Sequence, residues 1–174
     1  LLVRPRGGEV ALHEIGGAWS GEYFGVAVEG AGDVNADGTG DILATGRLYP
    51  SGQGGTGLVR ISSGADASLL HELVGSGTND ELGEAVAAAG DVDGDGHADV
   101  IASGGTDVYV GGQYATGYFR VFSGATGGVL FERLGVVEGG KLGLDVAGAG
   151  DLDGDGHDDV LVSEEDGGAG IGRV

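Results

Sequence analysis

Short apolar runs alternate with glycine-rich and acidic turns along the whole chain. The segments 57–75 (GLVRISSGADASLLHELVG) and 117–135 (GYFRVFSGATGGVLFERLG) each hold an alternating apolar run, a Ser-Gly-Ala turn and a second apolar run. Alternation with a period of two is typical of a β-strand, and a short turn between two such runs is typical of a hairpin. We therefore predict a β-hairpin in each segment.

The runs on both sides of the acidic turns also predict strands. The runs that follow the turns are rich in Ile, Val and Leu and end in small or polar residues: DILATG (41–46), DVIASG (99–104) and DVLVSE (159–164). The runs that precede them contain too much glycine for a stable helix: FGVAVEGAGDV (24–34), LGEAVAAAGDV (82–92) and LGLDVAGAGDL (142–152). Each acidic turn is therefore expected to join two β-strands.

These patterns repeat with a period of about 60 residues. The first aspartates of the acidic turns stand at 33, 91 and 151, and an arginine recurs in register at Arg4, Arg60, Arg120 and Arg173. The segment 1–17 matches the hairpin, and 168–174 matches its first strand. A repeat of this length with four strands is the signature of a β-propeller blade. We predict an all-β chain of about three repeats, built from four-stranded antiparallel blades and forming one propeller segment over residues 1–174.

The predicted strands number thirteen: a terminal hairpin, two four-stranded units and three strands of a last unit. Complete propellers have four to eight blades, so thirteen strands leave sheet edges exposed. Two alternatives follow. Either the chain is a fragment of a longer propeller, or copies of it complete one another as a closed ring or an open fibre.

The acidic turns have the ligands of a calcium site. All three fit D-x-[DN]-x-D-G-x-x-D, over residues 33–41, 91–99 and 151–159. Ca²⁺ takes six to eight oxygens from carboxylates, carbonyls and water. Positions 1, 3, 5 and 9 would supply side-chain oxygens, and position 7 would supply a backbone carbonyl. The candidate ligands are Asp33, Asn35, Asp37, Thr39, Asp41, Asp91, Asp93, Asp95, His97, Asp99, Asp151, Asp153, Asp155, His157 and Asp159.

Two other interpretations of the turns are less favoured. A single turn of this kind could be a solvated acidic turn, because Asp and Gly are common turn residues, but three turns with the same ligand pattern argue against that. An EF-hand needs a helix on each side and a glutamate at position 12. Position 12 is Ala44, Ala102 and Val162 here. We predict about three Ca²⁺ sites between strands.

The repeat resembles the FG-GAP repeat of integrin α-subunit propellers, which also occurs in many secreted bacterial proteins and some fungal lectins. Phe24-Gly25 matches the Phe-Gly of that motif, and Leu82-Gly83 and Leu142-Gly143 match its common variants. The later Gly-Ala-Pro is replaced by residues 44–46, 102–104 and 162–164. The resemblance implies a β-propeller in which the loop between the first two strands of a blade binds Ca²⁺.

The composition of the chain disfavours some classes of binding partner and cellular location. The chain has 28 acidic against 8 basic residues, a formal net charge of −20, and twelve of the acids lie in the three loops. This charge disfavours nucleic acid, which needs a basic surface. No run is long enough to cross a bilayer. The chain lacks cysteine, and bound metal can stabilise the fold in place of disulfide bonds. Loops of this kind suit millimolar free Ca²⁺, and we therefore expect an extracellular or cell-surface protein.

Candidate catalytic residues are few. His13 and His71 occupy the same place on the fourth strand of their repeats, which indicates repeat architecture. His97 and His157 stand at loop position 7, where only the carbonyl is needed. No nucleophile with a paired base stands out, and a glycosidase would need two carboxylates across a cleft. We predict that the chain is not an enzyme.

Binding is the favoured function. The connections 47–56 and 105–116 differ between repeats and carry Tyr49, Tyr109 and Tyr114, and Trp19 is an unrepeated aromatic. We predict a calcium-binding adhesion or assembly module whose partner is a cell-surface protein, a glycan or further copies of the chain. The alternatives are a carbohydrate-binding lectin and an accessory propeller domain of a secreted hydrolase.

Overall fold

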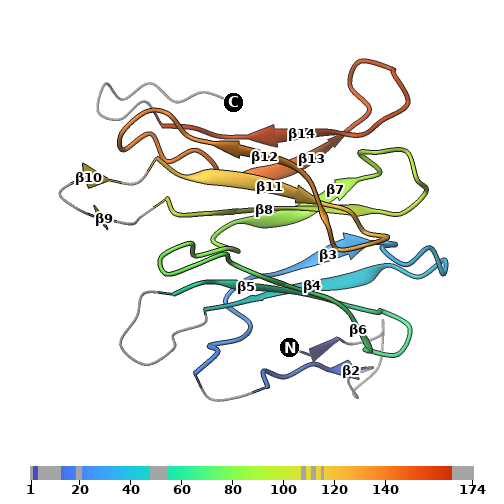
Figure 1. Ribbon diagram of the computed structural model, residues 1–174. Coiled ribbons are helices and arrows are strands. Elements are labelled where there is room, and N and C mark those ends of the chain that lie inside the picture. The colour runs from blue at the N-terminus through green and yellow to red at the C-terminus, as the bar shows by residue number, and fades with distance from the viewer. Residues whose placement is uncertain are drawn as a thin grey trace.

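The computed structural model describes residues 2–3, 13–18, 21–47, 55–106, 109–110, 113–114 and 116–165. These residues form β-strands joined by turns, and no helix occurs among them. Two four-stranded antiparallel sheets form the centre of the molecule (Figure 1). The first consists of β3 (Val28–Gly32), β4 (Asp41–Gly46), β5 (Leu58–Ser62) and β6 (Leu69–Val74), in that order.

The second sheet repeats the first. It consists of β7 (Val86–Gly90), β8 (Asp99–Gly104), β11 (Tyr118–Phe122) and β12 (Val129–Leu134), and each strand pairs with the next along the sheet. Arg60 pairs with Ala44 in the first sheet, and Arg120 pairs with Ala102 in the second, so the arginine does mark the register. The predicted all-β fold of four-stranded antiparallel blades is confirmed.

Two-stranded sheets flank the two full blades. β1 (Leu2–Val3) pairs with β2 (His13–Glu14), and β13 (Val146–Gly150) pairs with β14 (Asp159–Val162). The connection 105–116, predicted as a loop, contains a short ribbon of β9 (Tyr109–Val110) and β10 (Gln113–Tyr114). The predicted strand at 168–174 lies outside the described residues, as do Arg4 and Arg173.

A β-bulge ends the first strand of each repeat. The pairing register shifts between Gly30 and Gly32 against β4, and the same shift occurs in β7 and β13. The glycine after each bulge has a positive φ, 79° at Gly32, 82° at Gly90 and 68° at Gly150. Glycine adopts this backbone conformation without the clash that a side chain would cause. The bulge therefore turns the chain into the acidic loop that follows.

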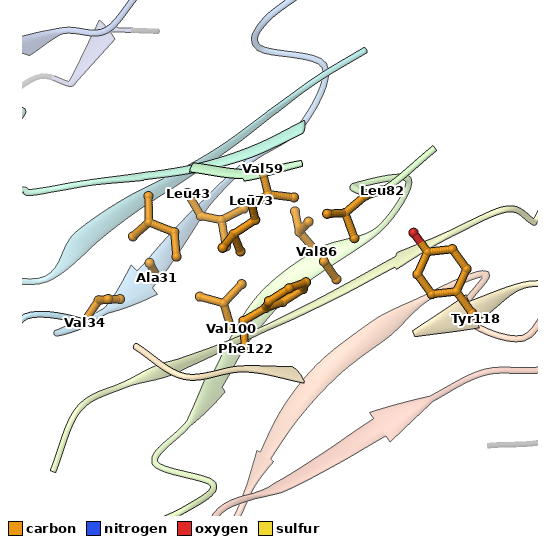
Figure 2. Packing of buried hydrophobic residues seen from close by; sticks show 12 residues of the cluster. Ala31, Val34, Leu43, Val59, Leu73, Leu82, Val86, Val100, Tyr118 and Phe122 are labelled. Carbon is orange, nitrogen blue, oxygen red and sulfur yellow. The ribbon is translucent and has the colours of Figure 1, made fainter. Parts of the chain in front are cut away.

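The hydrophobic core lies between blades. One cluster joins Leu43 and Val59 of the first blade to Val86, Val100 and Phe122 of the second, and Figure 2 shows these side chains facing one another. A second cluster joins the other face of the second blade to the β13–β14 hairpin through residues that include Ile101, Phe119 and Val146. Each sheet thus buries one face against the next repeat, as propeller blades do.

The leucine of each Leu-Gly motif forms a backbone bridge to the preceding blade. Gly57 forms a parallel bridge with Leu82, and Gly117 forms one with Leu142. A Cβ atom on Gly57 would lie 2.1 Å from the Leu82 backbone nitrogen, so no side chain fits there. β3, β7 and β13 lie side by side. The loops that follow them therefore lie at the same end of the stacked blades, on the right of Figure 1.

Candidate metal sites

The three acidic loops share one hydrogen-bond frame. We number their positions from Asp33, Asp91 and Asp151. In each loop the carboxylate at position 1 accepts hydrogen bonds from the backbone N–H groups of positions 5 and 6, at 2.8–3.1 Å. An aspartate that bonds to the backbone following it is a common way to stabilise a tight turn. The repeated ligand pattern in the sequence therefore corresponds to a repeated loop conformation.

Position 9 closes each loop on itself and joins the first two loops to the rest of their blades. The carboxylate of this residue accepts from the position 2 N–H at 2.8 Å in the first two loops and at 2.9 Å in the third. Asp41 also accepts from Gly64 N at 3.0 Å, and Asp99 from Gly124 N at 2.9 Å. Both glycines belong to the Ser-Gly-Ala turn of the outer hairpin. Position 9 thus connects the acidic loop to that hairpin.

Asp99 is fully buried. Burial raises the pKa of its carboxyl above the ordinary value, and hydrogen bonds from the backbone of Gly124 and Val92 partly oppose that rise. The charge of Asp93 raises it further. A cation beside Asp99 would favour the charged form and offset these effects.

Positions 1, 3 and 9 converge in the second and third loops. Oxygens of Asp91, Asp93 and Asp99 lie within 4.8 Å of one another, and so do those of Asp151, Asp153 and Asp159. Three carboxylates at this distance repel one another. They also form a hard oxygen donor set of the kind that Ca²⁺ prefers. The residues present therefore fit a hard divalent cation.

The predicted ligands at position 5, and Asn35 at position 3 of the first loop, are not part of the two carboxylate triads. The position 5 carboxylates of Asp37, Asp95 and Asp155 accept the position 7 N–H at 2.8–2.9 Å and lie outside the two triads. In the first loop Asn35 replaces the position 3 aspartate and donates to Asp37 Oδ2 at 2.9 Å. That bond lowers the pKa of Asp37, and a backbone bond from Thr39 adds to the effect.

The histidine side chains at position 7 have a role that the sequence analysis missed. His97 Nδ1 lies 2.8 Å from the carbonyl oxygen of Val34, and His157 Nδ1 lies 3.1 Å from that of Val92. Each histidine thus reaches position 2 of the preceding loop. The only sequence signal was the recurrence of histidine at this position in two loops. A partner more than sixty residues away gives no local pattern.

The other two histidines join blades at the outer hairpins. His71 Nε2 lies 2.6 Å from the carbonyl oxygen of Gly124, and His13 Nε2 lies 3.2 Å from that of Gly64. In both cases the fourth strand of one repeat contacts the Ser-Gly-Ala turn of the next. These contacts agree with the prediction that His13 and His71 belong to the repeat architecture.

The arginines that recur in the third strand of each blade form ion pairs with buried acidic side chains. Arg60 pairs with the fully buried Glu22 and, at 2.8 Å, with Glu72. Its guanidinium also lies over the ring of Phe24, 5.1 Å from the centroid. The acidic partner stands two residues before the Phe-Gly motif. The sequence carries no local signal for this pairing, because Glu22 and Arg60 are 38 residues apart.

Arg120 occupies the equivalent place in the second blade. It pairs with Asp80 at 3.3 Å and with Glu132 at 2.5 Å, and lies 4.4 Å from the Tyr118 ring centroid. Burial acts to raise the pKa of Asp80, but hydrogen bonds from Tyr118 and Ser76 and the charge of Arg120 outweigh it and lower the pKa. Burial, together with the neighbouring Asp80, raises the pKa of the Tyr118 hydroxyl. Asp80 is therefore held in its charged form.

A hydroxyl side chain stands in the three-residue segment that replaces Gly-Ala-Pro in each repeat. Thr45 Oγ1, Ser103 Oγ and Ser163 Oγ accept hydrogen bonds from backbone N–H groups of the Phe-Gly or Leu-Gly segment, at 3.1, 3.2 and 2.8 Å. The end of the second strand is therefore fastened to the start of the first strand in all three repeats, despite the departure from the motif.

The aromatic residues of the variable connections are only partly among the described residues. Tyr49 and Trp19 lie outside the described residues. Tyr109 and Tyr114 pair with each other through the backbones of β9 and β10.

The fold and the loops define a class of protein: stacked four-stranded blades with an acidic loop after the first strand of each repeat. Comparison with known proteins narrows that class. The chain is 29% identical over 166 residues to human integrin alpha-IIb, 30% identical over 180 residues to mouse integrin alpha-E and 32% identical over 163 residues to Xenopus laevis integrin alpha-4. No protein-family model matches the chain.

These matches cover 87–95% of the chain but only 15–16% of each integrin subunit. They confirm the resemblance to the FG-GAP repeats of integrin α subunits. The chain thus carries an integrin α-like propeller module. Within the described residues, no helix has the length and apolarity needed to traverse a membrane.

Proposed function

We propose that this chain is a calcium-binding, extracellular propeller module that serves adhesion through a protein partner. The observation that carries the proposal is the pair of carboxylate triads, each gathered within 4.8 Å, on loops of one conformation. Neighbouring repeats present these loops at the same end of the blades (Figure 1).

Each loop would hold one ion through its own residues. Positions 1, 3 and 9 would supply side-chain oxygens, which the second and third loops gather. Position 5 would add a carboxylate, and the carbonyls of Thr39, His97 and His157 would add the backbone ligand. The bound ion neutralises the repelling carboxylates and so stabilises the loop. Because the site is absent from the unfolded chain, the free energy of binding becomes free energy of folding.

Ca²⁺ fits these loops better than Mg²⁺. Mg²⁺ requires a near-ideal octahedron and keeps several waters, whereas Ca²⁺ accepts six to eight oxygens in flexible geometry. A loop with four side-chain ligands and one carbonyl suits the larger ion. Free Ca²⁺ near millimolar is an extracellular condition, which supports location outside the cell or at its surface.

The adhesive role is supported by the kind of relatives that the chain matches, since integrin α subunits share its repeats over nearly its whole length. The net charge of −20 disfavours nucleic acid and favours partners that carry basic groups. We treat residues 1–174 as one propeller segment with repeat loops at 33–41, 91–99 and 151–159.

Calcium binding is tested by replacing a ligand and removing the ion. Asp95→Ala should lower the melting temperature in millimolar Ca²⁺ and change it little in excess EGTA, because the carboxylate then has no ion to hold. Gly77→Ala, in the turn between β6 and β7, is a control, since a Cβ atom there meets nothing within 4 Å. An equal loss from Asp95→Ala with and without Ca²⁺ would refute a ligand role.

The partner is tested separately. Light scattering in Ca²⁺ and then in EGTA distinguishes a monomer from rings or fibres of the chain. A glycan array tests the lectin alternative, and binding to it would replace a protein partner by a sugar.

A further inference from the structure

Each acidic loop after the first contacts the loop of the preceding repeat. Residues at positions 7 and 8 of one loop bond to positions 1 and 2 of the loop before it. At the first junction His97 Nδ1 lies 2.8 Å from the Val34 carbonyl, and Ala98 N donates to the Asp33 carbonyl at 3.0 Å. Asp33 is the residue whose carboxylate occupies position 1 of the first site.

The second junction repeats these two bonds and adds a third. His157 Nδ1 lies 3.1 Å from the Val92 carbonyl, and Asp158 N donates to the Asp91 carbonyl at 3.0 Å. In addition, Asp91 N donates to Asp158 Oδ2 at 2.9 Å. Asp158 stands at position 8, which is not a ligand position, so its side chain serves the neighbouring loop.

The loops also pack tightly against one another. A Cβ atom on Gly94 would lie 2.9 Å from Cε1 of His157, and one on Gly32 would lie 2.7 Å from Cβ of Ala98. Gly32 adjoins position 1 and Gly94 is position 4, so the contact touches the part of the loop that carries the ligands. A shift of either loop would therefore move its neighbour.

We propose that His97, His157 and Asp158 are positioning residues that hold the loop of the preceding repeat in its ion-binding shape, so that neighbouring calcium sites fill cooperatively. The inference rests on the proposed calcium function. A loop whose carboxylates repel is held in one shape when an ion binds. Because position 1 is bonded to positions 7 and 8 of the next loop, part of the ordering cost is shared between two sites. Such coupling is reciprocal.

The test follows each loop separately during a Ca²⁺ titration. The amide signals of Gly38, Gly96 and Gly156 in ¹H–¹⁵N spectra report the position 6 backbone of the three loops. Asp155→Ala disables the third site without altering a ligand of the second. We expect this variant to raise the Ca²⁺ concentration at the midpoint of the Gly96 response about fivefold. A factor of about five in affinity is at the low end of what coupled binding sites typically show.

The roles of His157 and Asp158 are then tested by substitution. Each is replaced by the residue that another loop of the chain has at the same position. His157→Thr introduces the position 7 residue of the first loop and keeps the backbone carbonyl. Asp158→Ala introduces the position 8 residue of the second loop. In either background the effect of Asp155→Ala at Gly96 should fall from about fivefold to about twofold or less.

Two controls separate positioning from general stability. Asp158→Asn removes the same charge as Asp158→Ala but keeps an oxygen that can accept from Asp91 N, so the coupling should be retained. His71→Ala breaks a contact between blades at the outer hairpins, so it should lower the melting temperature and leave the coupling unchanged.

The outcomes distinguish the two proposals. If Asp155→Ala abolishes the response of Gly156 and leaves the midpoint at Gly96 unchanged, the sites are independent, and cooperativity is refuted while calcium binding stands. If His71→Ala reduces the coupling as much as His157→Thr does, the positioning role is refuted. If none of the three amides responds to Ca²⁺, the proposed function itself fails.

Discussion

The first and second repeats have the same architecture but differ at the residues that would hold an ion. The second loop has Asp93 at position 3 and Gly94 at position 4, whereas the first loop has Asn35 and Ala36. Ala36 adopts a φ of 58°, and Gly94 a φ of 76°, so both lie in the left-handed region. The frame of backbone bonds is nevertheless the same in both loops.

The comparison of the two loops shows that the loop conformation does not depend on the charge at position 3. A loop with one carboxylate fewer and a strained alanine still adopts the common shape, because the position 1 and position 9 carboxylates bind the backbone in both repeats. The shape therefore depends on these two positions. We expect the charge at position 3 to set how strongly each loop attracts a cation.

The largest expected effect comes from position 9. Asp99→Ala should lower the free energy of unfolding by about 3 kcal/mol, because the N–H groups of Val92 and Gly124 each lose an acceptor. The loss should appear in EGTA as well as in Ca²⁺, unlike that of Asp95→Ala. Urea unfolding in both conditions measures it, and Asp41→Ala is the matched variant of the first repeat. A loss confined to Ca²⁺ would show that Asp99 acts only as a ligand.

The arginine pockets of the two repeats differ as well, with Glu22 beside Arg60 and Asp80 beside Arg120. Asp80→Asn should cost about 2 kcal/mol at pH 7, since a charged partner of the poorly exposed Arg120 is lost. Because the folded pKa of Asp80 is lowered, its contribution is complete above the ordinary aspartate pKa of about 4 and is lost as pH falls through the folded value.

The direction of this pH dependence is tested by measuring the free energy of unfolding of wild type and of Asp80→Asn between pH 7 and pH 2. The difference between the two proteins should be constant above about pH 5 and should shrink in more acidic solution. A difference that grows on acidification would contradict the assigned cause of the shift.

The charge at position 3 should set the relative affinity of the loops. Asn35→Asp gives the first loop the carboxylate that the second one has, and should tighten Ca²⁺ binding at the first loop roughly tenfold, since ligand charge count tunes such sites. The midpoint at the Gly38 amide measures it, and the unchanged third loop is the internal control. An unaltered midpoint would show that the charge at position 3 does not set the affinity of the loop.

The smallest effect is expected at position 4. Ala36→Gly should stabilise the chain by about 1 kcal/mol, because glycine avoids the clash of a Cβ atom in the left-handed region. The reverse change, Gly94→Ala, should destabilise by more than that, because its Cβ would also meet the His157 ring. Thermal unfolding of both variants checks the pair, and equal effects would contradict the packing argument.

The sequence predicted the features that depend on neighbouring residues. Hairpins appeared as alternating runs such as 57–62 and 69–74, and turns appeared as Asp-Gly pairs, because strand and turn preferences act over a few residues. The repeat then identified the blade. The ribbon β9–β10 was missed because two strands of two residues leave no periodic pattern.

The sequence by itself determined the blades, the loops and the candidate ligands in those loops. Only the tertiary structure decided which groups meet: Arg60 with Glu22, His71 with the next outer turn, and His97 with the preceding loop. It also decided burial, since Val34 at position 2 is fully buried in the core shared by the two blades. The physical reason is that the first contact folds the start of a repeat back onto its third strand, and the other two form between blades. Their partners lie about forty to sixty residues apart and come together only when whole sheets form and stack.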